Sequence, residues 1–163
     1  ALVIGALAGM APDLDILIRS NLDPLLFLEF HRQFTHSLIF IPVGALICAL
    51  AFYPFSKARL SFAHIYLFSF LGFATHGLLD ACTSYGTQLF WPFSNVRVAW
   101  NTVSIIDPMF TLPVLVLVLI AAKKKNNLYA RLAFVYAVIF LALGVLQKNR
   151  AEIALNELAK QRG

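Results

Sequence analysis

The sequence predicts an all-α integral membrane protein, a bundle of about four to five transmembrane helices with two long polar loops on one face. Hydrophobic residues make up 60% of the chain and charged residues 13%, with a mean hydropathy of +0.78. Soluble domains are roughly half apolar and about a quarter charged, so the bilayer is the solvent of this chain. Helices of about 20 residues each would use nearly all of its 163 residues, which leaves no need for a second domain.

Apolar runs give the expected helices in order. The first run, residues 1–11, is too short to span a bilayer and lacks the basic start of a signal peptide. It opens without a methionine, so we expect an N-terminal piece to precede it. Four longer runs follow, at residues 38–55, 62–79, 109–122 and 128–146. We expect residues 1–147 to form the transmembrane domain and residues 148–163 a polar helical tail that leads into a further segment.

The connections between these runs alternate in length, with long ones at residues 12–37 and 80–108 and tight ones at residues 56–59 and 123–127. Successive loops of a helical bundle lie on opposite sides of the membrane, so the two long loops share one face. The short-loop face holds Lys57, Arg59, Lys123, Lys124, Lys125 and Arg131, against Arg19, Arg32 and Arg97 in the long loops. The positive-inside rule makes the short-loop face cytoplasmic and puts the long loops in the periplasm of a Gram-negative cell, although Lys148 and Arg150 oppose this orientation.

The charge and the cysteines exclude other classes of protein. The formal charge of +5 comes from residues in gaps between apolar runs, where they set membrane orientation, so we expect no nucleic-acid partner. Cys48 and Cys82 form neither a disulfide framework nor a zinc-ribbon pattern. The sequence has no internal repeat of the kind that marks inverted-repeat transporters.

Candidate metal ligands gather on the long-loop face. They are Asp13, Asp15, His31, His36, His76, Asp80 and Asp107, which include three of the four histidines and four of the five aspartates. His76 and Asp80 are four residues apart on an expected helix and so project from one side. The carboxylates of Asp13 and Asp15 converge only if the helix unwinds there. Imidazole and carboxylate ligands together suit zinc, manganese or iron.

Each residue also has a structural alternative. Aspartates before helices are often N-caps, and Asp107 followed by Pro108 is typical of a helix start. His36 could stack at the interface and His31 could be a surface histidine. Ionisable side chains at the end of a membrane helix are costly and usually functional, which favours His76 and Asp80 as ligands. The joint pattern therefore predicts a metal site, with Tyr85, Trp91 and Trp100 anchoring or lining it.

These motifs resemble one known family. They are residues 11–15 (APDLD), 31–37 (HRQFTHS), 76–80 (HGLLD) with Thr83, Tyr85 and Gly86, and 105–108 (IIDP). The set, in this order, is similar to the predicted membrane-bound metal-dependent hydrolases, the YdjM-like proteins, over residues 1 to about 147. The resemblance implies a bacterial inner-membrane protein and a hydrolase. Members usually begin with a further short segment, which this sequence lacks. A fainter similarity links the His-x-x-x-Asp helix to zinc-dependent phospholipase C and P1-type nucleases.

The resulting hypothesis is hydrolysis of a lipid or lipid-linked phosphoester by a metal-activated water. Two divalent ions, preferably zinc, would be held by Asp13, Asp15, His31, His36, His76 and Asp80. Arg32 would clamp a phosphate, and Asp107 would orient a ligand or act as a base. Hydrolysis of an ester or an amide would use the same residues and metal ions.

Two other functions stay open. A metal or proton transporter predicts ionisable residues deep in the helices, where only His64 qualifies, and a non-enzymatic lipid-binding protein predicts that loss of His76 costs stability alone. The sequence offers no nucleophile elbow for a serine or cysteine mechanism. It leaves the oligomeric state undefined.

Overall fold

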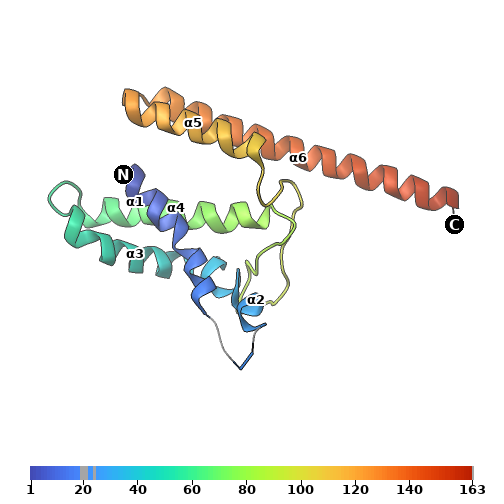
Figure 1. Ribbon diagram of the computed structural model, residues 1–163, viewed down its shortest axis with the longest axis horizontal. Helices are drawn as coiled ribbons and strands as arrows, with labels where there is room; N and C mark the ends of the chain where they lie inside the picture. Colours follow the sequence, from blue (N-terminus) through green and yellow to red (C-terminus); the bar gives the residue numbers. More distant parts are fainter. Residues whose placement is uncertain (19–21, 24, 163) are drawn as a thin grey trace. The chain divides into compact units, whose positions relative to one another are not determined.

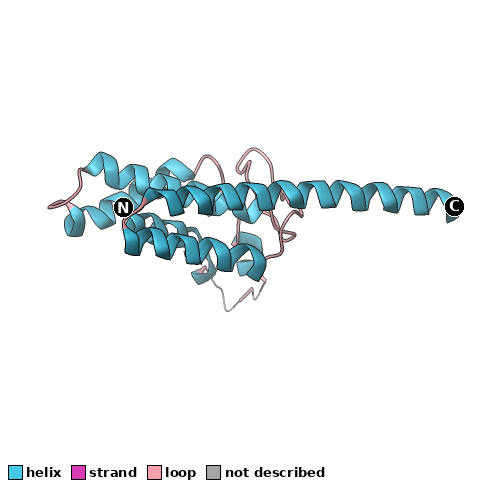
Figure 2. Cartoon of the chain, turned by 90° about the horizontal axis from the view of Figure 1, so that it is seen from above, coloured by secondary structure: helices cyan, strands magenta, loops and turns pink. Residues whose placement is uncertain are grey.

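The computed structural model describes residues 1–18, 22–23 and 25–162, so Arg19 lies outside the described residues. The elements are α1 (Leu2–Met10), η1 (Pro12–Leu17), α2 (Leu26–Phe30), η2 (Phe34–His36), α3 (Ile41–Ser56), α4 (Phe62–Ala81), α5 (Pro108–Lys124) and α6 (Asn127–Arg162), where η marks a 3-10 helix. Helices joined by loops make up the described part, and its β structure is a single bridge between Thr87 and Val98 (Figure 2). The predicted all-α class is confirmed.

The chain divides into two compact units. The first contains residues 1–81 and 85–99, and the second contains residues 82–84 and 100–162. Each unit is described by itself below.

In the first unit, α1 and α3 both pack against α4 (Figure 1). The contact of α1 with α4 is made through glycines, because a Cβ added at Gly72 would overlap the carbonyl oxygen of Gly5. Small residues let membrane helices approach closely. On the α3 side, the ring of Phe73 occupies the space above Gly44. This packing fixes the end of α1, and therefore η1, beside the second half of α4.

Two of the described helices meet the length and composition expected of a membrane span. By length and composition, α4 and α6 are apolar and long enough to cross a membrane, with 20 and 36 residues. A third span is possible if Leu26–His36 and Ile41–Ser56, bent by 86°, are counted as one broken or re-entrant segment. The described helices therefore support two or three spans, against the four to five predicted. The difference comes from length, because α3 has 16 residues and α5 has 17, at the short end of the range of about 17–25 residues for a membrane-spanning helix.

In the second unit, α5 and α6 form a helical hairpin. Its turn lies at Lys125, which ends α5 in a left-handed conformation with φ of 51°. The loop before α5 is tied to residue 82 by hydrogen bonds from the Thr102 and Val103 N–H groups to the Cys82 carbonyl oxygen. The helix α6 continues unbroken to Arg162, so residues 148–162 extend the same helix.

Candidate metal centre

Two aspartates enter the site from η1. The α-helix α1 changes to the tighter 3-10 form at Pro12, and Asp13 and Asp15 lie in its first turns. Their side chains have different surroundings, since that of Asp13 is 52% exposed and that of Asp15 is fully buried. They therefore do not converge on one point.

Buried Asp15 organises the loop that follows α2. Its Oδ1 atom lies 2.7 Å from Nδ1 of His31, and its Oδ2 atom accepts hydrogen bonds from the Arg32 N–H at 3.0 Å and the Thr35 hydroxyl at 2.8 Å. Arg32 takes a left-handed backbone conformation, with φ of 59°, at this point. The carboxylate thus shapes the loop that carries His36.

The other two ligands stand on α4. His76 and Asp80 are one turn apart, with the Nε2 and Oδ2 atoms separated by 3.2 Å. Between them, Gly77 faces the backbone of His36, whose carbonyl oxygen would lie 3.0 Å from a Cβ at that position. The absence of a side chain at Gly77 lets the 3-10 turn at His36 sit directly against α4.

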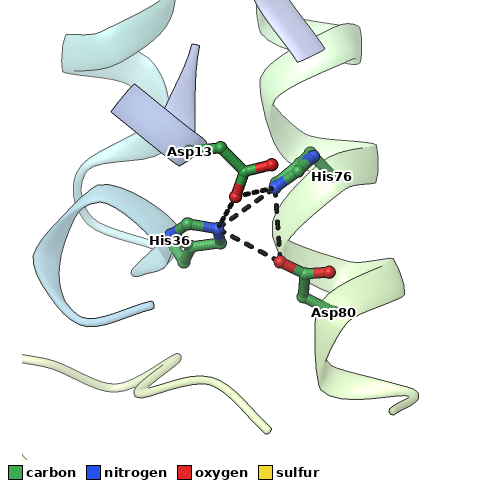
Figure 3. Close-up of side chains that lie close together, drawn as sticks. All are labelled: Asp13, His36, His76 and Asp80. Atoms are coloured by element: carbon green, nitrogen blue, oxygen red, sulfur yellow. Dashed lines mark hydrogen bonds and ion pairs between the residues drawn. The ribbon is translucent and has the colours of Figure 1, made fainter. Parts of the chain in front are cut away.

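Four donor atoms converge on one point (Figure 3), and each of Asp13, His36, His76 and Asp80 offers one of them within 4.8 Å of the others. The His36 Nε2 atom lies 3.1 Å from both His76 Nε2 and Asp80 Oδ2. Oδ1 of Asp13 lies 3.6 Å from His36 Nε2 and 3.3 Å from His76 Nε2. A tetrahedral ion with bonds of about 2.0 Å separates its donors by about 3.3 Å, so this set fits zinc.

The tautomer of His36 follows from its hydrogen bonds. The Thr35 hydroxyl donates its proton to Asp15, so its oxygen accepts the bond from His36 Nδ1, 2.9 Å away. The Nδ1 atom therefore carries the ring proton, and Asp15 Oδ2 lies 3.5 Å from the same atom. With an ion bound, Nε2 would give up its proton and its lone pair would face the ion, which is the arrangement of a metal-binding histidine held by a carboxylate.

The electrostatics keep the loop carboxylates ionised. Hydrogen bonds from His36 and then His76 hold the pKa of Asp13 well below its usual range. Burial alone would raise the pKa of Asp15, but hydrogen bonds from His36, His31 and Thr35 outweigh it and lower the pKa to about 2. Both groups are negatively charged at neutral pH, as a cation site requires.

One arginine contacts the cluster, and a second holds the loop that carries part of it. The Nη2 atom of Arg32 lies 3.2 Å from Asp80 Oδ1, which leaves Oδ2 directed at the two histidines. Arg32 and Arg97 each place their guanidinium 5.1 Å from the ring centre of Tyr85. Arg97 also donates hydrogen bonds to the carbonyl oxygens of Leu28 and His31, so it ties the second long loop to the first.

The structure sorts the predicted site residues into three sets. Asp13, His36, His76 and Asp80 form the group that could hold an ion, and no second such group occurs in the part of the chain that the structure describes. Asp15, His31 and Arg32 lie beside it as supports, so the geometry favours one ion over two. Asp107 belongs to the second unit, where its Oδ1 atom caps α5 by accepting from the Met109 and Phe110 N–H groups.

Sequence reasoning assigned no role to Thr35, Gly77 or Arg97. Thr35 and Gly77 fall inside the motifs at residues 31–37 and 76–80, so adjacency to a ligand was an available signal. Arg97 lies outside every motif, so the sequence contains no signal for its role in the site. The remaining histidine, His64, lies near the start of α4 and pairs with Ser61.

The fold and the site define a helical membrane protein with an Asp/His group suited to a metal ion. Comparison with known proteins agrees with the membrane assignment. The sequence matches the family described as YdjM inner membrane protein over residues 1–151, and the chain belongs to that family. It is 32% identical over 109 residues to the Uncharacterized protein YfhP of Bacillus subtilis (strain 168), which covers 66% of this chain and 33% of that protein. The match thus spans about a third of the length of this curated relative, and no solved structure matches the chain.

Proposed function

We propose that this protein is a membrane-embedded metal-dependent hydrolase that acts on a lipid or a lipid-linked phosphoester. The observation that carries the proposal is the convergence of two imidazole nitrogens and two carboxylate oxygens. Zinc fits the donor set best, and manganese or iron also accept it. A divalent ion held there would supply Lewis-acid chemistry, lowering the pKa of water and polarising the scissile bond.

Asp13 has a special place among the four ligands. A catalytic tetrahedral site keeps one position open, whereas four protein ligands close it. Asp13 is half exposed, while His36, His76 and Asp80 are much less exposed. Asp13 would therefore be the most exchangeable of the residues that hold the ion, and its exposed carboxylate would be placed to take up a proton from water.

Arg32 supplies the positive charge that a phosphoester needs. A guanidinium carries five N–H groups in a planar fork. Arg32 can therefore contact a phosphate oxygen while it stays on Asp80, and its stacking against Tyr85 fixes the plane of the fork.

We also propose that the cluster faces away from the cytosol. Asp80 lies at the end of α4, and Lys57 and Arg59 precede the start of the same helix. A helix of 20 residues is about 30 Å long, so it carries the basic turn and the cluster at opposite ends. The basic end belongs on the cytoplasmic side. Labelling of a Lys57→Cys variant by a membrane-impermeant thiol reagent only after cell lysis would agree with this orientation.

Metal content tests the site. Elemental mass spectrometry of the purified protein should find close to one zinc or manganese ion per chain, and a His76→Ala, Asp80→Ala double variant should lose it. The matched control is His64→Ala, which removes an imidazole from the other end of the same helix and should keep the ion. Absence of metal after reconstitution with zinc, manganese and iron would reject the site.

Turnover tests the reaction. Metal-loaded wild type and the double variant are compared for phosphate or alcohol release from phosphatidic acid and phosphatidylglycerol in mixed micelles. The proposal expects turnover in the wild type that falls at least a hundredfold in the double variant. Bound metal without turnover of any lipid phosphoester would reject this substrate class.

A further inference from the structure

An apolar groove of about 510 Å³ runs along the first unit between α1, α3 and α4. Its walls include Leu7 and Met10 of α1, Ile47 and Phe52 of α3, and Phe73 of α4. Leu7, Met10 and Ile47 are exposed, so the groove opens along the side of the unit.

One end of the groove is lined by residues close in sequence to the metal ligands. Three lining residues are neighbours of its donors: Leu14 follows Asp13, Thr35 precedes His36, and Phe73 stands one turn before His76 on α4. The Thr35 hydroxyl is the polar side-chain group of the lining, and it is already bonded to Asp15 and His36. The groove is thus apolar along its length, and at this end its lining residue Thr35 contacts His36 of the cluster.

We propose that this groove binds one acyl chain of a membrane phospholipid and holds its headgroup phosphoester at the Asp13, His36, His76 and Asp80 cluster. The inference rests on the proposed function and deepens it, because it names the part of the substrate that gives affinity. A molecule with a long apolar chain and an anionic head matches an apolar groove that ends at Thr35, a neighbour of the cation-binding cluster. The volume lies within the range of about 300–1,000 Å³ of ordinary ligand pockets.

A lipid chain fits this groove better than a protein partner does. Within a bilayer, lipid tails are as apolar as leucine side chains, so an apolar surface gives little drive for helices to associate. The close helix contacts in this unit instead use glycines, as at Gly5 with Gly72. The groove offers large side chains at its open edge, namely Leu7, Met10, Leu14 and Ile47.

Filling the groove tests the proposal. Ile47→Trp places a large ring in the groove, and Leu50→Trp is the matched control on α3, because Leu50 lies outside the lining and is equally exposed, at 58% against 57%. Native mass spectrometry of the detergent-purified full chain, mixed with dipalmitoyl phosphatidylglycerol, counts the lipids retained. We expect one retained lipid in the wild type and in Leu50→Trp, and at least tenfold less in Ile47→Trp. sn-Glycero-3-phosphoglycerol, the same molecule without its acyl chains, should not be retained.

Lipid binding in the groove can be tested separately from the hydrolase activity. Metal content is measured in all three proteins and should be equal, and the His76→Ala, Asp80→Ala variant should still retain the lipid, if more weakly. Retention that depends on Ile47 supports the groove even if no lipid is hydrolysed. Equal retention in Ile47→Trp and Leu50→Trp, or none in the wild type, overturns it. A cross-link from an Ile47→Cys variant to a second copy, with no lipid retained, would also overturn it and assign the groove to protein.

Discussion

Asp15 and Asp13 contact opposite nitrogens of one imidazole ring: Asp15 Oδ2 lies 3.5 Å from Nδ1 of His36, and Asp13 Oδ1 lies 3.6 Å from its Nε2. Two carboxylates separated by one residue therefore have different roles. Asp13 is on the side of the candidate ion, and Asp15 holds the ring in place from behind through Thr35.

Loss of the support behind His36 should weaken metal binding. In Thr35→Val the side chain keeps its shape but loses the hydroxyl that accepts from Nδ1, so the ring and its tautomer are no longer fixed. We expect zinc affinity to fall about 10- to 100-fold, measured by competition with a chelator. Thr75→Val is the control, since Thr75 bonds only to the carbonyls of its own helix. Equal affinities in the two variants would contradict the role of Thr35.

Substitutions of Asp13 and of His76 should have different effects on metal content. If Asp13 is the exchangeable ligand, Asp13→Asn should retain most of the ion and lose at least a hundredfold in turnover of phosphatidic acid. His76→Ala should lose the ion itself. Metal analysis and turnover on the same samples distinguish the two, and loss of metal in Asp13→Asn would show that Asp13 is an ordinary ligand.

Asp107 should act as a helix cap. Its Oδ1 atom accepts from the N–H groups of Met109 and Phe110, and loss of such a cap costs about 1 kcal/mol. We expect Asp107→Ala to lower the thermal unfolding temperature in detergent and Asp107→Asn to restore it, because an amide oxygen also caps. A hundredfold loss of turnover in a stable Asp107→Asn protein would instead support the base predicted from the sequence.

The α1–α4 contact should not tolerate a methyl group at Gly72. A Cβ there would overlap the Gly5 carbonyl oxygen, whereas a Cβ at Gly5 lies 3.5 Å from the Phe68 carbonyl oxygen, an ordinary contact. Alanine favours a helix over glycine by about 1 kcal/mol, so Gly5→Ala should be neutral or stabilising. Gly72→Ala should lower the unfolding temperature and reduce metal retention, because η1 moves with α1. Equal unfolding temperatures would argue against this packing.

Acid should remove the contribution of Asp15 to stability. Its pKa is lowered to about 2 in the folded protein, from 3.8 for the free side chain. A depressed carboxyl pKa stabilises the fold above the unfolded value, and this stabilisation is lost as the pH falls from about 4 towards 2. Unfolding temperatures measured across this range should fall more steeply for the wild type than for Asp15→Asn. Parallel curves would mean that Asp15 is not held as an ion.

The sequence was informative where the chemistry is local. The spacing of His76 and Asp80 on a helix places their side chains together, and the structure has them 3.2 Å apart. Spacing cannot tell which ring nitrogen a carboxylate reaches, so Asp15 and His31 were grouped with the ligands although they pair with each other. It also cannot show that Gly77 admits the backbone of His36. The span count depends on helix ends that composition does not define, since α3 and α5 have 16 and 17 residues, at the short end of the range for a membrane span.

The length of α6 has a consequence for the surroundings of its last residues. Its 36 residues make a rod of about 54 Å, whereas the hydrocarbon core of a bilayer is about 30 Å thick. Tilt can absorb only part of this excess, and the polar residues from Lys148 onward cannot lie among lipid tails. If α6 crosses the membrane, its final turns stand in water as a rigid stalk, and Arg162 lies beyond the headgroups.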